Sequence, residues 1–210
     1  MVVMHNPYQQ TRFLLGTPDN RRAPPDTGAE VAFAGRSNAG KSSALNVITG
    51  QRSLARTSKA PGRTREINFF VVRDDLRLVD LPGYGYAKVS RSIKDQWQRN
   101  ISRYLENRRS LCGVILLMDV RHPLKEFDQQ VLGWCHAAGL QTHVLLTKSD
   151  KLKRGPAKST LLQVRKQLTA LHPDATVQLF SAHTRAGREE VQHILDSWLG
   201  VEEDPTSVAP

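Results

Sequence analysis

Eight residues, GRSNAGKS (35–42), constrain the fold of this chain more than any other segment. They fit the pattern G-x-x-x-x-G-K-[ST], in which glycines let the backbone wrap phosphate groups and backbone amides donate hydrogen bonds to them. The apolar run AEVAFAG (29–35) precedes the pattern with strand character, and KSSALNVITG (41–50) follows as a predicted short helix. A strand, a glycine-rich loop and a helix in this order predict an α/β domain that binds phosphates at the start of the helix.

The side chains of this loop have separate expected roles. Lys41 should reach the β- and γ-phosphates of a nucleotide, and the Ser42 hydroxyl should bind Mg²⁺. The loop residues expected to contact the ligand are Gly35, Arg36, Ser37, Asn38, Ala39, Gly40, Lys41, Ser42 and Ser43. The alternative interpretation of this segment, taken alone, is a glycine-rich turn without a ligand.

The rest of the chain alternates strand-like and helix-like segments. Strands are predicted over 67–72, 76–80, 112–119, 142–147 and 176–182, and helices over 93–105, 123–138, 158–171 and 188–199. The first two of these strands flank Asp74-Asp75 and read as an antiparallel hairpin. Because several other strands are apolar throughout, we predict a mostly parallel six-stranded sheet with helices on both faces. Ligands in such folds bind beyond the carboxyl ends of the strands.

The length of 210 residues indicates one compact domain with short tails. We predict an N-terminal arm over 1–24, the folded domain over 25–200 and a flexible tail over 201–210. No apolar run reaches 18 residues and the start lacks a signal-peptide pattern, so neither a membrane span nor secretion is expected. Cys112 and Cys135 lie in apolar segments without metal-ligand spacing, which predicts buried reduced thiols in a cytoplasmic protein.

The net charge of +10 is concentrated in one part of the chain. Residues 51–109 carry fourteen Lys and Arg against six Asp and Glu, whereas residues 110–210 carry eleven of each. A localised basic surface points to a polyanion such as RNA, with an anionic membrane as the less favoured partner. The alternative is a solvated basic face.

A second group of motifs indicates which base is bound. LLTKSD ends a predicted strand, and an Asp150 carboxylate at its exit can accept two hydrogen bonds from guanine. Adenine would leave this carboxylate unpaired, which penalises the wrong base. The Lys148 stem can lie along the base, and the Ala182 amide in FSAH can donate to the guanine carbonyl. The predicted base-side contacts are Thr147, Lys148, Ser149, Asp150, Phe180, Ser181 and Ala182.

A third group has the pattern of a switch that senses the γ-phosphate. In DLPG (80–83), Asp80 should hold Mg²⁺ through a water and the Gly83 amide should contact the γ-phosphate. Thr64, in the long loop before the next strand, is the candidate to complete the Mg²⁺ shell, and Thr57 is a poorer one. The predicted contacts of the two switches are Gly62, Arg63, Thr64, Asp80, Leu81, Pro82 and Gly83.

These motifs occur in the order of a Ras-like GTPase and span residues 35–182. The longer segments GRSNAGKSS, KAPGRTREINFF, DLPGYGYAK and MDVRHPLKEFD closely resemble the bacterial EngB family, also called YihA or YsxC. The resemblance implies a GTPase, converting GTP to GDP and phosphate, that acts in large ribosomal subunit assembly with rRNA and ribosomal proteins as partners. We expect the protein to be a monomer, although the sequence does not give the oligomeric state. The resemblance also implies a link to cell division and septation, and it makes residues 25–200 the G domain.

Tyr84 occupies the position at which many switches carry a water-orienting glutamine. A phenol cannot orient water as an amide does, so its side chain should turn away, intrinsic hydrolysis should be slow, and Tyr84→Ala should change the rate little. Asn38 is the first candidate to replace the function of the glutamine, because GTPases with this asparagine are often activated by potassium. The alternative is that Asn38 is a loop residue that binds no ion. Arg63, acting in cis, is the second, with RNA contact or solvation as its alternative. The proposed catalytic set is Lys41, Asn38, Thr64 and Gly83.

Two other functions fit part of the pattern. A phosphoryl-transferring kinase could use the same phosphate loop, but the T-K-x-D and S-A elements argue against it. A binding module of the division machinery could use slow hydrolysis as a timer. His122 and His183 lie near strand ends, and neither is assigned to chemistry.

Overall fold

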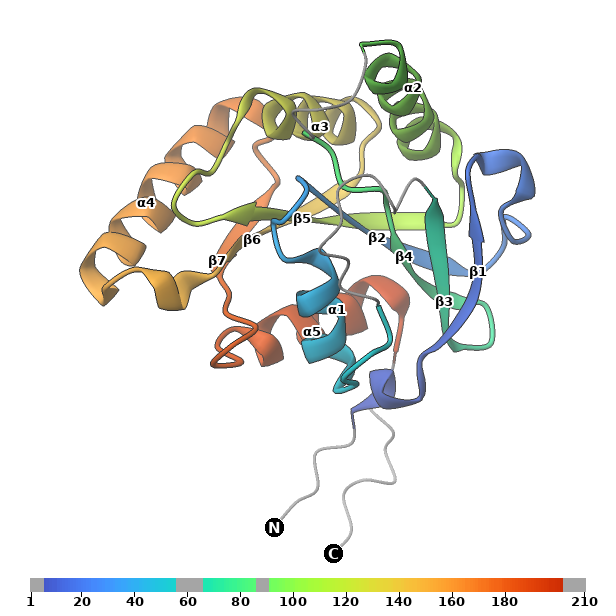
Figure 1. The fold of residues 1–210 in the computed structure, drawn as a ribbon, viewed down its shortest axis with the longest axis horizontal. Coiled ribbons are helices and arrows are strands. Elements are labelled where there is room, and N and C mark those ends of the chain that lie inside the picture. The colour runs from blue at the N-terminus through green and yellow to red at the C-terminus, as the bar shows by residue number, and fades with distance from the viewer. Residues whose placement is uncertain (1–5, 56–65, 86–90, 202–210) are drawn as a thin grey trace, which may run out of the picture.

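The computed structural model describes residues 6–55, 66–85 and 91–201, which form one seven-stranded sheet and five α-helices (Figure 1). The strands are β1 (Arg12–Thr17), β2 (Ala29–Gly35), β3 (Ile67–Arg73), β4 (Leu76–Asp80), β5 (Leu111–Asp119), β6 (Gln141–Thr147) and β7 (Thr176–Leu179). The α-helices are α1 (Lys41–Thr49), α2 (Arg91–Asn107), α3 (Glu126–Ala137), α4 (Arg154–Leu171) and α5 (Arg188–Leu199). Short 3-10 helices are η1 (Pro7–Gln10), η2 (Asn20–Arg22) and η3 (Ser149–Lys151). Among these segments, no helix combines the length and apolar character needed to cross a membrane.

The sheet is mostly parallel and has the order β1-β3-β4-β2-β5-β6-β7. β2 pairs in parallel with β4 and β5, and β6 and β7 continue the parallel part. β3 pairs antiparallel with β1 and β4, so the predicted hairpin is present. The predicted α/β fold, with a mostly parallel sheet and helices on both faces, is confirmed.

The sheet has one strand more than predicted, because residues 12–17 form the edge strand β1. The pairing of β1 with β3 is irregular between Phe13 and Leu15, and its first three residues are exposed. A regular alternation of buried and exposed residues, which would predict a strand, is therefore absent. The segment predicted as an arm thus adds β1 to the sheet, and Tyr8 in η1 is fully buried. Residues 202–210 of the predicted tail lie outside the described residues.

Two apolar clusters lie on opposite faces of the sheet. On β2, Ala32 and Ala34 belong to one cluster, while Val31 and Phe33 belong to the other, as expected for a strand whose side chains alternate. The first cluster includes buried residues of α2, α3 and α4, and the second those of α1 and α5, which lie on opposite sides of the sheet in Figure 1. Covering both faces explains why β2 and β5 are largely apolar. Cys135 is a buried free thiol as predicted, whereas Cys112 is only half-buried.

A buried carboxylate ties three elements together next to the sheet. Glu30 of β2 is fully buried and accepts hydrogen bonds from Arg77 of β4 at 2.7 Å, Arg108 at 2.6 Å and Tyr104 of α2 at 2.8 Å. Burial alone would raise the Glu30 pKa, but the hydrogen bonds from Arg108 and Tyr104 lower it overall. The carboxylate therefore stays ionised, and removing either arginine would leave it poorly compensated.

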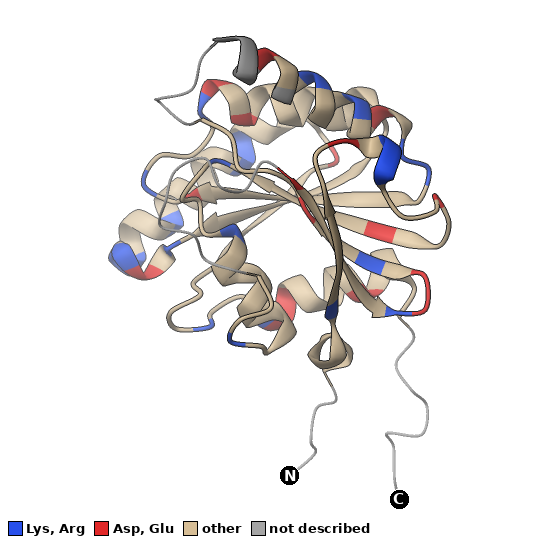
Figure 2. Cartoon of the chain, turned by 45° about the vertical axis from the view of Figure 1, so that its right-hand side comes forward, with Lys and Arg blue, Asp and Glu red and all other residues tan. Residues whose placement is uncertain are grey.

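This network changes the interpretation of the basic stretch over 51–109. Two of its fourteen cations, Arg77 and Arg108, are used inside the protein, and Arg108 also faces the Asp26 carboxylate at 3.6 Å. In Figure 2 most Lys and Arg positions lie on helices and loops, and few lie within strands. Arg99 and Arg103 of α2 are exposed and remain available to a partner.

Candidate functional site

The phosphate loop lies between β2 and α1, at the carboxyl edge of the parallel strands. Gly40 caps α1 with a φ of +94°, and Asn38 has a φ of 65°, so the loop reverses before the helix begins at Lys41. An added Cβ at Gly35 would lie 2.7 Å from the Leu117 carbonyl oxygen, which leaves room only for glycine. The backbone amides of the first turn of α1 therefore face the loop, where an anion is favoured.

Three residues predicted to act at the phosphate end are brought together. Parallel pairing places Asp80 beside Phe33 near the end of β2, and the Asp80 carboxylate lies 3.2 Å from the Lys41 ammonium. Gly83 packs on the loop, because an added Cβ there would lie 3.4 Å from Ser37 N and 3.5 Å from Lys41 Nζ. Lys41 and Asp80 are both largely buried, so their charges act in a poorly screened environment.

The oxygen atoms at this end fit a hard cation. The Asp80 Oδ1 is buried and, in the part of the chain that the structure describes, accepts no hydrogen bond besides its ion pair with Lys41. The Ser42 hydroxyl lies in the first turn of α1. The described residues hold no group of three His, Cys, Asp or Glu side chains that could bind a metal ion on its own. An Mg²⁺ ion held by Asp80 and Ser42 would complete its shell with phosphate oxygens and waters, as is usual for this ion. The predicted residues Gly62, Arg63, Thr64 and Thr57 lie outside the described residues.

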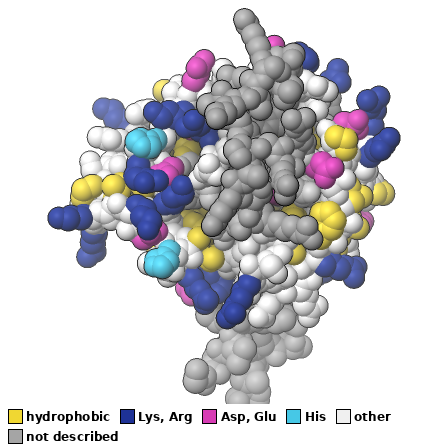
Figure 3. Space-filling view, viewed as in Figure 1, with side chains coloured by type: hydrophobic (Ala, Val, Ile, Leu, Met, Phe, Trp, Pro, Cys, Tyr) yellow, Lys and Arg dark blue, Asp and Glu magenta, His cyan; other side chains and the backbone are white. Residues whose placement is uncertain are grey.

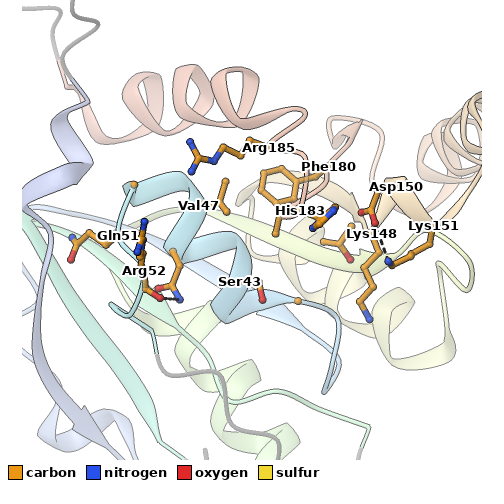
Figure 4. Close-up of a pocket in the computed structure, with 15 residues that line it drawn as sticks. Ser43, Val47, Gln51, Arg52, Lys148, Asp150, Lys151, Phe180, His183 and Arg185 are labelled. Carbon is orange, nitrogen blue, oxygen red and sulfur yellow. Dashed lines mark hydrogen bonds and ion pairs between the residues drawn. The ribbon is translucent and has the colours of Figure 1, made fainter.

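The loops after β6 and β7 form the other end of the site. A cavity of about 830 Å³ lies between α1 and these loops, lined among others by Ser43, Lys148, Asp150 and Ala182 (Figure 4). Phe180 is fully buried beneath it, and His183 lies on its rim, whereas His122 is exposed on the loop after β5.

Asp150 is held in place by a neighbouring hydroxyl. The Ser181 hydroxyl donates to Asp150 Oδ1 at 2.6 Å, and Ser181 is itself fully buried. This hydrogen bond lowers the pKa of Asp150, which keeps the carboxylate ionised at neutral pH. The second oxygen pairs with exposed Lys151 at 3.3 Å, an interaction weak enough to yield to a ligand.

Thr147 and Lys148 connect the base end to the phosphate loop. The Thr147 hydroxyl donates to the carbonyls of Ala39 at 2.6 Å and Met118 at 3.1 Å, so it supports the loop from below. The Lys148 ammonium donates to the Asn38 carbonyl at 2.7 Å. Both residues line the cavity, and the hydrogen bonds that they make hold the phosphate loop.

Asp119 is a site residue that the sequence analysis did not single out. Its carboxylate lies 3.0 Å from the Lys148 ammonium and 2.6 Å from Arg121, and the Arg121 and Lys148 hydrogen bonds hold its pKa well below the usual range. The only sequence signal was its place at the end of β5, within the segment MDVRHPLKEFD.

Tyr84 points away from the phosphate end. Its ring is 1% exposed, its hydroxyl donates to Asp128 Oδ1 at 2.7 Å, and its centroid lies 4.4 Å from that of Phe127. Because the ring is part of the core, Tyr84→Ala would open a cavity that costs about 3–5 kcal/mol of stability. The sequence alone predicts that Tyr84→Ala changes the hydrolysis rate little, but this expectation leaves out the loss of core packing. Tyr84→Phe is more informative, because it removes the hydroxyl and keeps the ring.

The fold resembles those of two solved proteins that bind guanine nucleotides or are described as GTP-binding. A solved probable GTP-binding protein engB covers 83% of this chain with a TM-score of 0.67 at 20% identity, over 100% of its own length. Era, solved with MgGDPNP and nucleotides 1506–1542 of 16S ribosomal RNA, covers 87% of this chain with a TM-score of 0.61 at 23% identity, over 59% of its own length. At these identities the likeness concerns the fold alone.

Sequence comparisons identify the family. A family model described as 50S ribosome-binding GTPase matches residues 30–148, so the chain is a P-loop GTPase. A probable GTP-binding protein EngB of Salmonella paratyphi C is 56% identical over 192 residues, 91% of each chain. A protein of the same description from Coxiella burnetii is 52% identical over 91% of this chain and 94% of its own. The chain belongs to the EngB family of GTP-binding proteins.

Proposed function

We propose that this protein is a GTP-dependent switch that hydrolyses GTP slowly and acts in assembly of the large ribosomal subunit. The observation that carries the nucleotide part is the placement of Lys41, Asp80 and Gly83 at one end of the site and of Asp150 at the other. A cavity of about 830 Å³, lined by Asp150 and by Gly40 at the end of the phosphate loop, has a volume within the range of small-molecule sites.

In this proposal each residue has a defined task. Lys41 and the loop amides bind the β- and γ-phosphates, and Gly83 contacts the γ-phosphate through its amide. Ser42 and Asp80 hold Mg²⁺ with Thr64, and the ion offsets the charge that develops on the phosphates. Asp150 and the Ala182 amide select guanine. Hydrolysis is slow because the Tyr84 side chain is committed to the core and orients no water.

Potassium is proposed to supply part of the missing catalysis. Asn38 lies exposed in the phosphate loop, with its carbonyl held by Lys148. A cation bound there would offset transition-state charge as an arginine finger does. We expect about tenfold faster single-turnover hydrolysis in potassium than in sodium at matched ionic strength, and Asn38→Ala should lose only the potassium-dependent part.

The matched control for this prediction is Asn107→Ala, which removes an exposed amide from the end of α2. It should keep the full response to potassium. Equal wild-type rates in the two salts would remove the ion from the proposal and make Arg63 the next candidate.

The ribosomal part rests on charge and on family. The matching family model is described as a 50S ribosome-binding GTPase, and exposed Arg99 and Arg103 lie on α2, which follows the segment DLPG. Figure 3 shows further Lys and Arg side chains gathered on the side of the site that carries α4. Exposed cations on that side include Arg121, Lys151, Lys153 and Arg154. A basic surface beside the nucleotide site would let RNA binding depend on the nucleotide state.

Binding to large-subunit particles is expected to require GTP and to weaken steeply with salt, because phosphate contacts release counterions. Arg99→Glu with Arg103→Glu should lower this binding about tenfold or more without changing GTP affinity. Reversal of Arg91 and Lys94 on the same helix should act in the same direction. The measurement is co-sedimentation on sucrose gradients at several salt concentrations, with a non-hydrolysable GTP analogue or GDP.

The control, Arg12→Glu with Arg73→Glu, makes the same charge change on the exposed ends of β1 and β3. Equal losses in both double variants would indicate a general charge effect, and binding indifferent to salt would remove RNA from the proposal. Capture of division proteins without ribosomal particles would favour the alternative of a division-machinery module. We further propose a cytoplasmic monomer whose link to division and septation follows from ribosome assembly.

A further inference from the structure

The segment 81–84 continues β4 along the end of β2 and onto the phosphate loop. Leu81 N donates to the Phe33 carbonyl at 3.0 Å, and Tyr84 N donates to the Gly35 carbonyl at 3.3 Å. In return, Ser37 N donates to the Tyr84 carbonyl at 2.7 Å. These backbone hydrogen bonds place Gly83 against the loop, next to the ammonium of Lys41.

The other side of this segment is fastened by the Tyr84 side chain to α3. The Tyr84 hydroxyl donates to one oxygen of Asp128, and the other oxygen accepts from Lys125 N at 3.0 Å. Asp128 is 1% exposed, so this hydrogen bond is shielded from water. Burial raises the pKa of the Tyr84 phenol well above its usual value, so the proton stays on the tyrosine.

The strand that precedes α3 ends at the base end of the site. Asp119 at the end of β5 pairs with Lys148, which holds the Asn38 carbonyl, and α3 begins seven residues later. The end of β5 therefore contacts the lysine of T-K-x-D, and the start of α3 contacts the residue after Gly83. A movement of Gly83 can therefore be transmitted to α3 through the side chain of Tyr84.

We propose that Tyr84 and Asp128 form a positioning pair that holds Gly83 ready to contact the γ-phosphate, and that this pair sets the preference of the protein for GTP over GDP. The inference rests on the proposed function, because it needs the Gly83 amide at the γ-phosphate. GDP lacks that group, so the pair should matter for GTP and hardly at all for GDP. If Gly83 is already held in the position that binds the γ-phosphate, GTP binding does not have to supply the free energy of ordering this segment.

The structure contains a matched control for the hydrogen bond. The Tyr8 hydroxyl donates to Asp196 Oδ1 at 2.6 Å, and Tyr8 is fully buried like Tyr84. This pair joins η1 to α5, on the opposite face of the sheet from α3. Tyr8→Phe and Tyr84→Phe therefore both remove a tyrosine–aspartate hydrogen bond from a buried phenol, although Asp196 is half-buried and Asp128 is buried. Only Tyr84 lies beside the nucleotide site.

The test is calorimetric affinity for a non-hydrolysable GTP analogue and for GDP, with thermal stability measured on each variant. Tyr84→Phe should weaken binding of the analogue about fivefold to tenfold and change GDP binding less than twofold. Tyr8→Phe should lower stability to a similar extent and leave both affinities unchanged. Asp128→Ala should reproduce the analogue loss, and adding it to Tyr84→Phe should cost little more, since coupled residues are not additive.

The outcomes separate this inference from the proposed function. If the wild-type protein binds no guanine nucleotide, the proposed function itself fails. If it binds both nucleotides but Tyr84→Phe changes their affinities equally, or no more than Tyr8→Phe does, the positioning pair is refuted. Tighter analogue binding in Tyr84→Phe would also refute it, because the bond would then hold Gly83 away from the phosphate. Should Asp128→Ala fail to fold, the comparison of the two tyrosine variants decides alone.

Discussion

Lys41→Ala is expected to lower GTP affinity at least about 100-fold, the largest single effect at the phosphate end. In the proposed site its ammonium would make charge-assisted hydrogen bonds to two phosphates, and each such bond contributes roughly 1.5–3 kcal/mol. Ser42→Ala should instead lower Mg²⁺-dependent turnover while GDP still binds, since the change removes the proposed metal ligand and no cation. Affinity is measured by calorimetry and turnover by phosphate release.

The structure adds one requirement to this experiment. Lys41 neutralises the buried Asp80 carboxylate at 3.2 Å, so the alanine variant also loses folding stability. Circular dichroism melting must therefore accompany the binding data, and Lys158→Ala, which removes an exposed lysine of α4, is the control for charge. Wild-type GTP affinity and turnover in a folded Lys41→Ala protein would refute the assigned role.

Asp150→Asn is expected to reduce GTP affinity about 100-fold or more and to shift the preference towards xanthosine triphosphate. An amide in place of the carboxylate cannot accept from both guanine donors, and sites built on such pairing discriminate strongly. Xanthine presents an oxygen where guanine has its amino group, so the amide can donate to it. Ser181 can still donate to the asparagine oxygen, so the loop after β6 should stay in place.

Competition binding with the four triphosphates of guanine, adenine, xanthine and hypoxanthine measures this shift. Asp174→Asn, at an exposed aspartate before β7, should leave the preference unchanged. Equal affinities of the wild-type protein for ATP and GTP would overturn the assignment of Asp150 as the guanine reader.

Local sequence signals determined most of the architecture. The central strands β2 and β5 are largely apolar because both of their faces are covered, and the bounds of β2, β4 and α5 match those predicted. The phosphate loop, DLPG and T-K-x-D each follow a strand of the parallel sheet. Because parallel strands share one carboxyl edge, their positions in the chain already implied that Lys41, Asp80 and Asp150 lie at one site.

Interactions between distant residues could be decided only by the tertiary structure. The edge strand β1 depends on pairing with β3, and its own residues lack the alternation that would predict it. The charge count over 51–109 could not show that Arg77 and Arg108 form ion pairs with buried Glu30. Burial and pairing are properties of contacts between segments far apart in the chain, so no local pattern reports them.

The same reason applies to the residue after Gly83. The sequence by itself determined that Tyr84 cannot orient water as glutamine does, because that follows from the side chain alone. Only the fold decided where the ring goes, since Asp128 and Phe127 lie more than 40 positions away and reach it through the packing of α3 on the sheet. The local sequence therefore determines which chemical groups this site contains, whereas long-range packing determines where those groups lie.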